Sequence, residues 1–99
     1  MPMVIISYSA LRSFYSKHPG AEDALNNWYR IVEKVDWKNF HEMKNVFNSV
    51  DAIGNDRYVF NIRGNTYRII AVVKFKSRTV YIRFVGTHSE YDKTDAENI

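Results

Sequence analysis

The chain has no cysteine among its 99 residues, which excludes disulfide bonds and thiolate chemistry. It also has no apolar run near the length of about 20 residues that a membrane-spanning helix requires. Its first residues lack the basic segment and the long apolar core of a signal peptide. These absences predict a cytoplasmic protein without membrane association. A chain of this length has room for one hydrophobic core, so we expect a single domain over residues 1–99.

The sequence also lacks the short motifs by which many enzymes are recognised. It contains no glycine-rich phosphate loop, no serine-nucleophile motif and no paired carboxylates. The three histidines, His18, His41 and His88, do not have metal-ligand spacing with one another or with a carboxylate pair. Kinase, hydrolase-triad and glycosidase functions therefore have no support, and we expect neither a metal ion nor another cofactor.

Acidic residues are absent between Arg57 and Ser89, where the chain carries seven basic residues. Residues 90–99 reverse this balance, with four acidic residues and one lysine. Such asymmetry is typical of a protein that binds a polyanion, and arginine side chains bind phosphate well. Lysines and arginines scattered over a solvated sheet face would give the same counts, so charge alone leaves both interpretations open.

Apolar periodicity changes from helical in the first half of the chain to alternating in the second. The expected elements are a short strand at 4–6, helices at about 9–18, 21–35 and 37–47, and strands at 58–62, 66–76 and 79–86. We expect Asp36 to cap the third helix and residues 47–56 to form a loop. This order predicts an α+β fold in which the helices pack on one face of an antiparallel sheet.

Two turns set the predicted strand register. Gly64-Asn65 is expected to form a two-residue type II′ hairpin turn, and Ser77-Arg78 to form the loop of the second hairpin. In this register Phe84 joins the apolar core face, and Arg68 lies opposite Thr87 on the other face. A slip of one residue would turn arginine side chains into the core, so the pattern disfavours it.

The face opposite the core is predicted to carry the functional side chains. Its polar residues are Asn61, Arg63, Arg68, Lys74 and Arg83, around a partly apolar floor of Val59, Ile70 and Val72. His88 follows the last strand and should emerge beside Arg68. Tyr91 lies three residues later, on the same side as His88 if the chain turns helically there.

These side chains have the chemistry that RNA cleavage without a metal needs, although each has a simpler role as well. Arg68 could bind a phosphate and stabilise developing charge, or it could be a surface cross-strand contact. His88 could transfer a proton near neutral pH, but a lone histidine is more often structural. Tyr91 could contact phosphate or stack on a base, or it could fasten the tail to the core.

Two longer motifs carry a resemblance to a known family. The run YVFNIRGNTYRIIA from Tyr58 to Ala71, followed by GTHSEYDK from Gly86 to Lys93, resembles the HigB-type toxins of bacterial toxin–antitoxin modules. The family pattern is close to YVFNI-GN-YRLI and then THxEYD. The resemblance covers nearly the whole chain, with Asn48 where the family often has proline.

The resemblance implies a RelE/ParE-like fold, in which a short N-terminal strand and two or three helices pack on one face of a curved antiparallel sheet. It implies a type II toxin that acts as a metal-independent endoribonuclease, an mRNA interferase that cuts mRNA on translating ribosomes. We expect the RNA 2′-OH to attack its own phosphate and leave a 2′,3′-cyclic end. The expected partners are a HigA-type helix-turn-helix antitoxin and, through that antitoxin alone, operator DNA.

By position, Arg68 matches the sheet arginine of the superfamily, and His88 and Tyr91 match C-terminal residues credited with proton transfer and phosphate contact. The expected RNA-binding residues are Arg63, Lys74, Arg83, Lys44 and Asn61. Two functions of other classes remain open. One is a ParE-like inhibitor of DNA gyrase, and the other is an RNA- or ribosome-binding module without catalysis.

Overall fold

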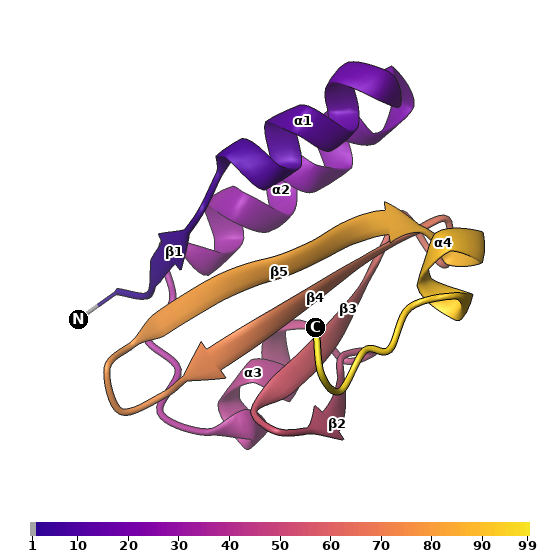
Figure 1. Cartoon of the computed structure of the whole chain (residues 1–99). Coiled ribbons are helices and arrows are strands. Elements are labelled where there is room, and N and C mark those ends of the chain that lie inside the picture. Colours follow the sequence, from indigo (N-terminus) through magenta and orange to yellow (C-terminus); the bar gives the residue numbers. More distant parts are fainter. Residues whose placement is uncertain (1) are drawn as a thin grey trace.

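The computed structural model describes residues 2–99, which form a five-stranded sheet and four α-helices. The elements are β1 (Val4–Ile6), α1 (Ser9–Lys17), a 3-10 turn (Pro19–Ala21), α2 (Glu22–Val32), α3 (Phe40–Val46), β2 (Asp51–Gly54), β3 (Arg57–Ile62), β4 (Tyr67–Lys74), β5 (Thr79–Thr87) and α4 (His88–Asp92). The strand order is β1-β5-β4-β3-β2 (Figure 1). The predicted α+β class and RelE-like architecture are confirmed. The sheet is mixed rather than wholly antiparallel, because β1 runs parallel to β5.

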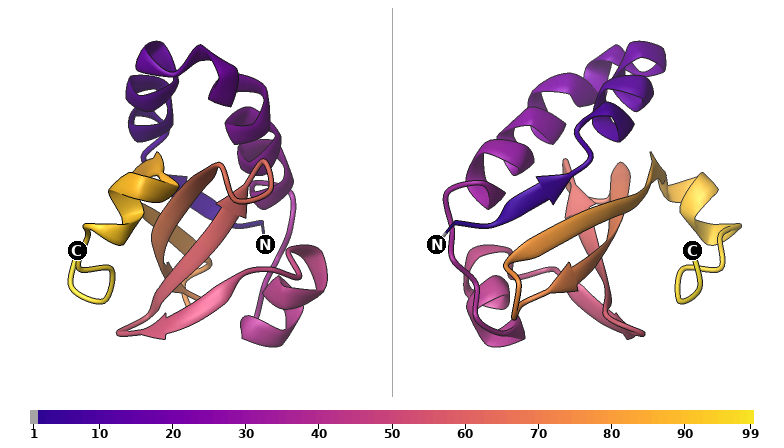
Figure 2. Two further views of the ribbon diagram at one scale, coloured as in Figure 1. Left: turned by 90° about the vertical axis from the view of Figure 1, so that its right-hand side faces the viewer. Right: turned by 60° about the vertical axis from the view of Figure 1, so that its left-hand side comes forward.

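The hydrophobic core lies between the helices and one face of the sheet. Along α2 the stripe Leu25, Trp28 and Val32 is fully buried, as its i, i+3, i+7 spacing predicts. The Trp28 ring meets the ring of Phe60 from β3 edge-on, with centroids 5.2 Å apart. α1 and α2 pack on each other, α3 lies behind the sheet as Figure 1 is drawn, and the chain after β5 runs in front (Figures 1 and 2).

The first hairpin has the predicted register. Ile62 lies opposite Tyr67, and Asn61 lies opposite Arg68. The Thr66 backbone N–H donates to the Arg63 carbonyl at 3.2 Å, which closes the turn. These pairs place Arg68 and Asn61 on the face turned away from the core. We call this the outer face, and its residues on β3 and β4 are Arg57, Val59, Asn61, Arg68, Ile70, Val72 and Lys74.

The second hairpin differs from the prediction in two ways. Its loop has four residues, 75–78, with Arg78 in the left-handed region at φ 53, rather than the two expected residues. A β-bulge then interrupts the ladder, because Ala71 pairs with Ile82 whereas Ile70 pairs with Phe84, so that Arg83 is the extra residue. A bulge reverses the faces of the residues beyond it.

The bulge changes the surroundings of the predicted site. Phe84 turns to the outer face, so its placement in the core was wrong. Arg68 lies opposite Gly86 rather than Thr87. Val85 takes the place of Phe84 against the core.

The expected loop over residues 47–56 was also wrong in part. Residues Asp51–Gly54 form β2, which pairs with β3 through Asp51 opposite Val59. The turn to β3 uses three consecutive left-handed residues, with φ 99 at Gly54, 52 at Asn55 and 61 at Asp56. β2 is short and mostly exposed, so it lacks the alternating apolar pattern by which a strand is recognised.

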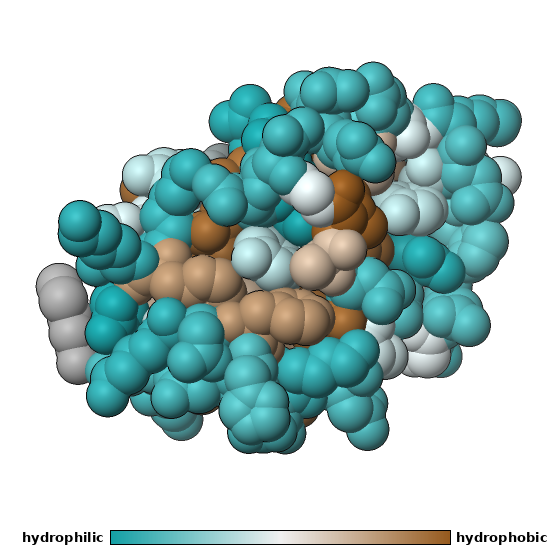
Figure 3. Space-filling model, turned by 90° about the horizontal axis from the view of Figure 1, so that it is seen from below, coloured by the Kyte–Doolittle hydropathy of each residue, from teal (hydrophilic) through white to brown (hydrophobic). Residues whose placement is uncertain are grey.

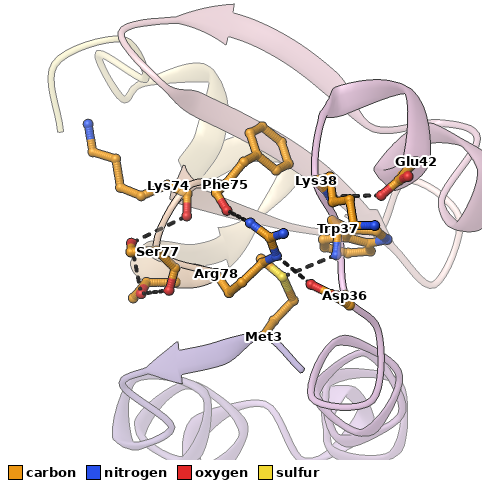
Figure 4. A network of polar contacts seen from close by, with 10 residues as sticks. Met3, Asp36, Trp37, Lys38, Glu42, Lys74, Phe75, Ser77 and Arg78 are labelled. Carbon is orange, nitrogen blue, oxygen red and sulfur yellow. Dashed lines mark hydrogen bonds and ion pairs between the residues drawn. The ribbon is translucent and has the colours of Figure 1, made fainter. Parts of the chain in front are cut away.

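A polar network joins the β4–β5 turn to the segment before α3 (Figure 4). The Arg78 guanidinium donates to the Asp36 carboxylate and to the Phe75 carbonyl. Asp36 therefore does not cap α3 as predicted. The cap is Asn39, whose side-chain oxygen accepts from the Glu42 backbone N–H at 3.0 Å.

Large apolar side chains reach the surface at Val4, Ile6 and Val46, which are 44–48% exposed. Seen from below, apolar residues form a band between hydrophilic ones (Figure 3). Within residues 2–99, no helix is both long enough and apolar enough to cross a membrane.

The Asp36–Arg78 contact should make stability depend on acid. The hydrogen bond from Arg78 lowers the pKa of Asp36 in the folded protein. The stability that the ionised Asp36 contributes is therefore fully present above the unfolded pKa of about 3.9, and it is lost as the pH falls through the lower folded pKa. Asp36→Asn should therefore be less stable than wild type at pH 7 and should lose less stability on acidification. Urea unfolding at neutral pH and at about pH 3 measures both effects.

The matched control is Glu33→Gln, which removes the same charge from an exposed side chain at the end of α2. It should leave both the stability at pH 7 and the slope with pH near wild type. Equal slopes in wild type and Asp36→Asn would contradict a stabilising role for this contact.

Candidate functional site

The site is built around α4, which begins directly where β5 ends. Thr87 and Glu90 form a capping box, in which the Glu90 N–H donates to Thr87 Oγ1 at 3.1 Å and the Thr87 N–H donates to Glu90 Oε1 at 2.8 Å. The His88 N–H donates to the Thr66 carbonyl at 3.2 Å and ties α4 to the first hairpin. The sequence Thr-His-Ser-Glu thus fixes the direction in which the following side chains leave the sheet.

Arg68 and Tyr91 lie in contact at the centre of this site. The guanidinium carbon of Arg68 lies 4.8 Å from the centroid of the Tyr91 ring, a cation–π arrangement. Arg68 Nε is buried and has no hydrogen-bond partner, and within residues 2–99 no carboxylate pairs with this guanidinium. The fold therefore leaves the charge of Arg68 available to an external anion.

His88 is held by Asp92, one turn further along α4. His88 Nδ1 lies 3.1 Å from Asp92 Oδ2, and both side chains are about half exposed. A carboxylate at this distance favours the tautomer that carries its proton on Nδ1, which leaves Nε2 as the nitrogen that faces other molecules. Asp92 thus orients His88, whereas Glu90 is engaged in the capping box.

Phe84 joins the site as a residue that the sequence assigned to the core. A Cβ atom on Gly86 would lie 2.4 Å from Cζ of the Phe84 ring, so the ring covers this glycine. Because Gly86 pairs with Arg68, the Phe84 ring lies beside that arginine on the outer face. An aromatic ring next to a free arginine can stack on a base, but the bulge that exposes it left no signal in the sequence.

The other predicted RNA-binding residues are divided between the outer face and the rest of the fold. Arg63 donates to the Gly20 carbonyl at 3.3 Å, toward the helices. Lys44 donates to the Val50 carbonyl at 2.9 Å from α3, behind the sheet, so the structure does not bring it together with Arg68. Asn61 lies opposite Arg68, and its side-chain N–H donates to the Ser49 carbonyl at 3.3 Å.

Lys74 and Arg83 contribute to a hollow further along the outer face. Its volume is about 380 Å³, and it is lined by Arg57, Val72, Lys74, Tyr81 and Arg83. Lys74 makes an exposed ion pair with Asp56 at 2.5 Å. Arg83, the bulged residue, is exposed, and within residues 2–99 its side chain makes no hydrogen bond or ion pair.

A second hollow of about 300 Å³ lies between α1 and the end of β5. Its charged residues are Lys17, His18, Arg83 and Glu90. The pKa of Glu90 lies below its usual value, first because the Thr87 backbone N–H donates to the carboxylate, with the charges of His18 and Lys17 adding to the effect. Glu90 is therefore held ionised as a structural group. Over residues 2–99, no three metal-ligating side chains come together in a group that could hold a metal ion.

The contact between Gly86 and Phe84 predicts a position sensitive to a single methyl group. Gly86→Ala should displace the Phe84 ring and lower the free energy of unfolding by about 1–3 kcal/mol, as overpacking does. The same substitution in a Phe84→Leu background should cost clearly less, since the clashing ring is gone. Urea unfolding of the four proteins measures this coupling, and an equal cost in both backgrounds would contradict the contact.

Comparisons with known proteins place the chain in a family. The HigB toxin family model, described as the RelE-like toxic component of a toxin–antitoxin system, matches residues 21–94. An mRNA interferase HigB from Escherichia coli O6:H1 (strain CFT073) is 31% identical over 93 residues, covering 92% of this chain and 90% of the relative. The mRNA interferase toxin HigB of Escherichia coli K12 and the mRNA interferase HigB of Shigella flexneri are each 37% identical over 92 residues, covering 91% of this chain and 88% of the relative. The chain therefore belongs to the HigB family of RelE-like toxins.

Proposed function

We propose that this toxin is an endoribonuclease that cleaves mRNA and so inhibits translation. The observation that carries the proposal is the position of the Arg68 guanidinium. It lies against the Tyr91 ring and has no acidic partner among the described residues. The helix that supplies Tyr91 also bears His88 and Asp92. This arrangement offers a charge for a phosphate and a nitrogen for proton transfer on one surface. The relatives named mRNA interferase support the same activity.

The reaction is an attack of the RNA 2′-oxygen on the adjacent phosphorus. The P–O bond to the 5′-oxygen of the next nucleotide breaks, and the products are a 2′,3′-cyclic phosphate and a free 5′-hydroxyl. One proton passes from the 2′-OH to water, and one proton reaches the 5′-oxygen from His88.

His88 is the proton carrier of this mechanism. With Nδ1 held by Asp92, Nε2 donates a proton to the 5′-oxygen when the ring is charged, or accepts the 2′-OH proton when it is neutral. We assign the general-acid role to His88, because Asp92 holds its Nδ1 and leaves Nε2 free to reach the leaving oxygen.

Arg68 and Tyr91 act on the phosphate. The negative charge of the phosphorane is greatest in the transition state, where a guanidinium that no other group neutralises stabilises it best. The Tyr91 ring holds that guanidinium in place, and its hydroxyl can contact the phosphate or its face can receive a base. Lys74, Arg83 and Asn61 extend the RNA-binding surface along the outer face, while Arg63 and Lys44 lie outside it and would contact only a longer RNA.

The partners follow from membership of a toxin–antitoxin family. We infer a HigA-type helix-turn-helix antitoxin that neutralises the toxin and carries it to operator DNA, and mRNA on translating ribosomes as the target in the cytoplasm. The cationic outer face suits the polyanionic surroundings of a ribosome.

The decisive experiment is mRNA integrity in a translating extract. Purified wild type should create new RNA 5′ ends that primer extension maps, and Arg68→Ala and His88→Ala should abolish them. Loss of a general acid lowers the rate by about 10²–10⁴-fold. Lys76→Ala, which removes an exposed charge from the β4–β5 turn, is the matched control and should cut as wild type does.

The other outcomes separate the alternative functions. Intact mRNA with blocked translation would identify a non-catalytic ribosome-binding module. Intact mRNA with normal translation would direct attention to DNA gyrase, which a supercoiling assay tests. Cutting by His88→Ala at the wild-type rate would remove His88 from the mechanism while leaving the nuclease.

Tyr91 offers a test of which part of its side chain matters. Tyr91→Phe keeps the ring under the Arg68 guanidinium and loses the hydroxyl, whereas Tyr91→Ala loses both. If the ring positions Arg68, the Phe variant should retain most of the cleavage rate and the Ala variant should lose at least tenfold. A Phe variant as poor as the Ala variant would instead assign the role to the hydroxyl.

A further inference from the structure

The hollow beside Arg57 lies on the same face as the proposed cleavage site. It is defined by Arg57, Val72, Lys74, Tyr81 and Arg83, and we call it the Arg57 hollow. Val72 lines its floor, and Ile70, the next outer-face residue toward Arg68 on β4, is fully buried. The hollow and the Arg68 site therefore lie on the same face of the sheet, with covered apolar residues between them.

The charges of the Arg57 hollow are unbalanced. Three of its five lining residues are cationic, and none is acidic. Its nearest neutralising contact is the Asp56–Lys74 pair, in which both side chains are more than half exposed, and such a pair contributes little in water. Tyr81 adds an aromatic ring on which a base can stack. This combination of cations and one aromatic ring suits a nucleotide.

Arg57 already holds an oxygen atom in this hollow. Its Nε and Nη2 donate to the Ile99 oxygen at 3.2 and 2.7 Å, so two parallel donors converge on one acceptor. Nη1 donates to the Asn55 carbonyl at 2.8 Å, which fixes the plane of the guanidinium. The same pair of guanidinium donors can bind a phosphate oxygen, and the Ile99 oxygen lies where that phosphate oxygen would bind.

The distance between the two places fits an RNA strand. Val72 follows Arg68 by four residues on β4, which spans about 13 Å at about 3.3 Å per residue. Stacked nucleotides advance about 3.4 Å each, so about four of them cover this distance. An RNA held at Arg68 therefore reaches the Arg57 hollow within a few nucleotides of the cut.

We propose that the Arg57 hollow is a second nucleotide subsite, in which Arg57 binds a phosphate of the RNA strand and Tyr81 receives a base. The proposal rests on the nuclease function proposed above and adds residues that set which flanking nucleotides the toxin engages. Arg83, which lines the same hollow, adds a further cation for the RNA backbone.

The C-terminal segment, residues 93–99, contacts the Arg57 side of this subsite in the free toxin. Besides the Ile99 contact, the Glu97 carbonyl accepts from the Asn55 side chain at 3.1 Å, so the segment crosses the front of the sheet from α4 to the β2–β3 turn (Figure 1). RNA must displace Ile99 from Arg57 before it fills the hollow. The segment is therefore a weak internal competitor of RNA.

Amide and side-chain NMR of the intact 99-residue toxin tests the subsite. The probes are 2′-O-methyl RNAs, which lack the attacking hydroxyl and are not cut. One has about two nucleotides, too few to reach from Arg68 to the hollow, and the other has about ten. Both RNAs should shift the signals of Arg68, His88 and Tyr91. The longer RNA alone should shift the Arg57 Nε–H and the Tyr81 ring, and should also shift Ile99 as the segment leaves.

Variants give an independent readout. Arg57→Ala and Tyr81→Ala should each weaken binding of the longer RNA by about tenfold, a typical cost of losing one stacking or phosphate contact, and should leave the short RNA unaffected. Lys76→Ala, outside the hollow, should change neither affinity beyond a small uniform effect. A variant that ends at Thr94 should bind the longer RNA more tightly than wild type does.

The outcomes separate this inference from the function on which it rests. Long-RNA shifts confined to Arg68, His88 and Tyr91 would overturn the subsite and leave the nuclease proposal standing. Shifts at neither place would count against RNA recognition by this face as a whole. Equal losses from Arg57→Ala for both RNA lengths would also overturn the subsite, since they would indicate a general effect on the fold.

Discussion

The extra residue Arg83 in β5 is the constraint on which the site depends. Without this bulge, the upper half of β5 would keep the alternation of its lower half, and Phe84 would face the core. The bulge turns Phe84 outward and sets the small Gly86 opposite Arg68, which leaves room for the Phe84 ring. It also projects Arg83 from the sheet between the two hollows that it lines. One inserted residue thus shapes both the proposed cleavage site and the surface beside it.

The basic residues between Arg57 and Ser89 do not act as one charged patch. Arg78 is engaged with Asp36, and Arg63 is directed to the Gly20 carbonyl, so these two stabilise the fold. Arg68 and Arg83 have no carboxylate partner among the described residues, and both lie where RNA would pass. The number of basic residues in the sequence is therefore larger than the number of cations available to a polyanion. The structure identifies which side chains are available.

Local signals predicted the parts of the fold that local chemistry determines. The Gly64-Asn65 turn fixed the first hairpin and with it the pairing of Arg68 with Asn61, and the Thr87–Glu90 spacing is the signature of the capping box that starts α4. The bulge had no such signal, because Phe84 and Val85 are neighbouring apolar residues and the pattern does not tell which of the two faces the core. The partner of Arg78 could not be predicted from the sequence either, since Asp36 lies 42 residues away along the chain.

The acidic end of the chain gains a meaning from the contacts of Arg57. From sequence alone, the residues after Tyr91 are only a polar tail with an excess of acidic side chains. In the structure the end of this tail lies in front of the sheet, and the Ile99 oxygen accepts from two nitrogen atoms of the Arg57 guanidinium. Acidic side chains in the tail add long-range attraction to that face without forming tight ion pairs, so the tail is held weakly and is open to exchange. If RNA binds this face as proposed, the tail and the RNA compete for the Arg57 guanidinium, and the tail would return to Arg57 once the product leaves.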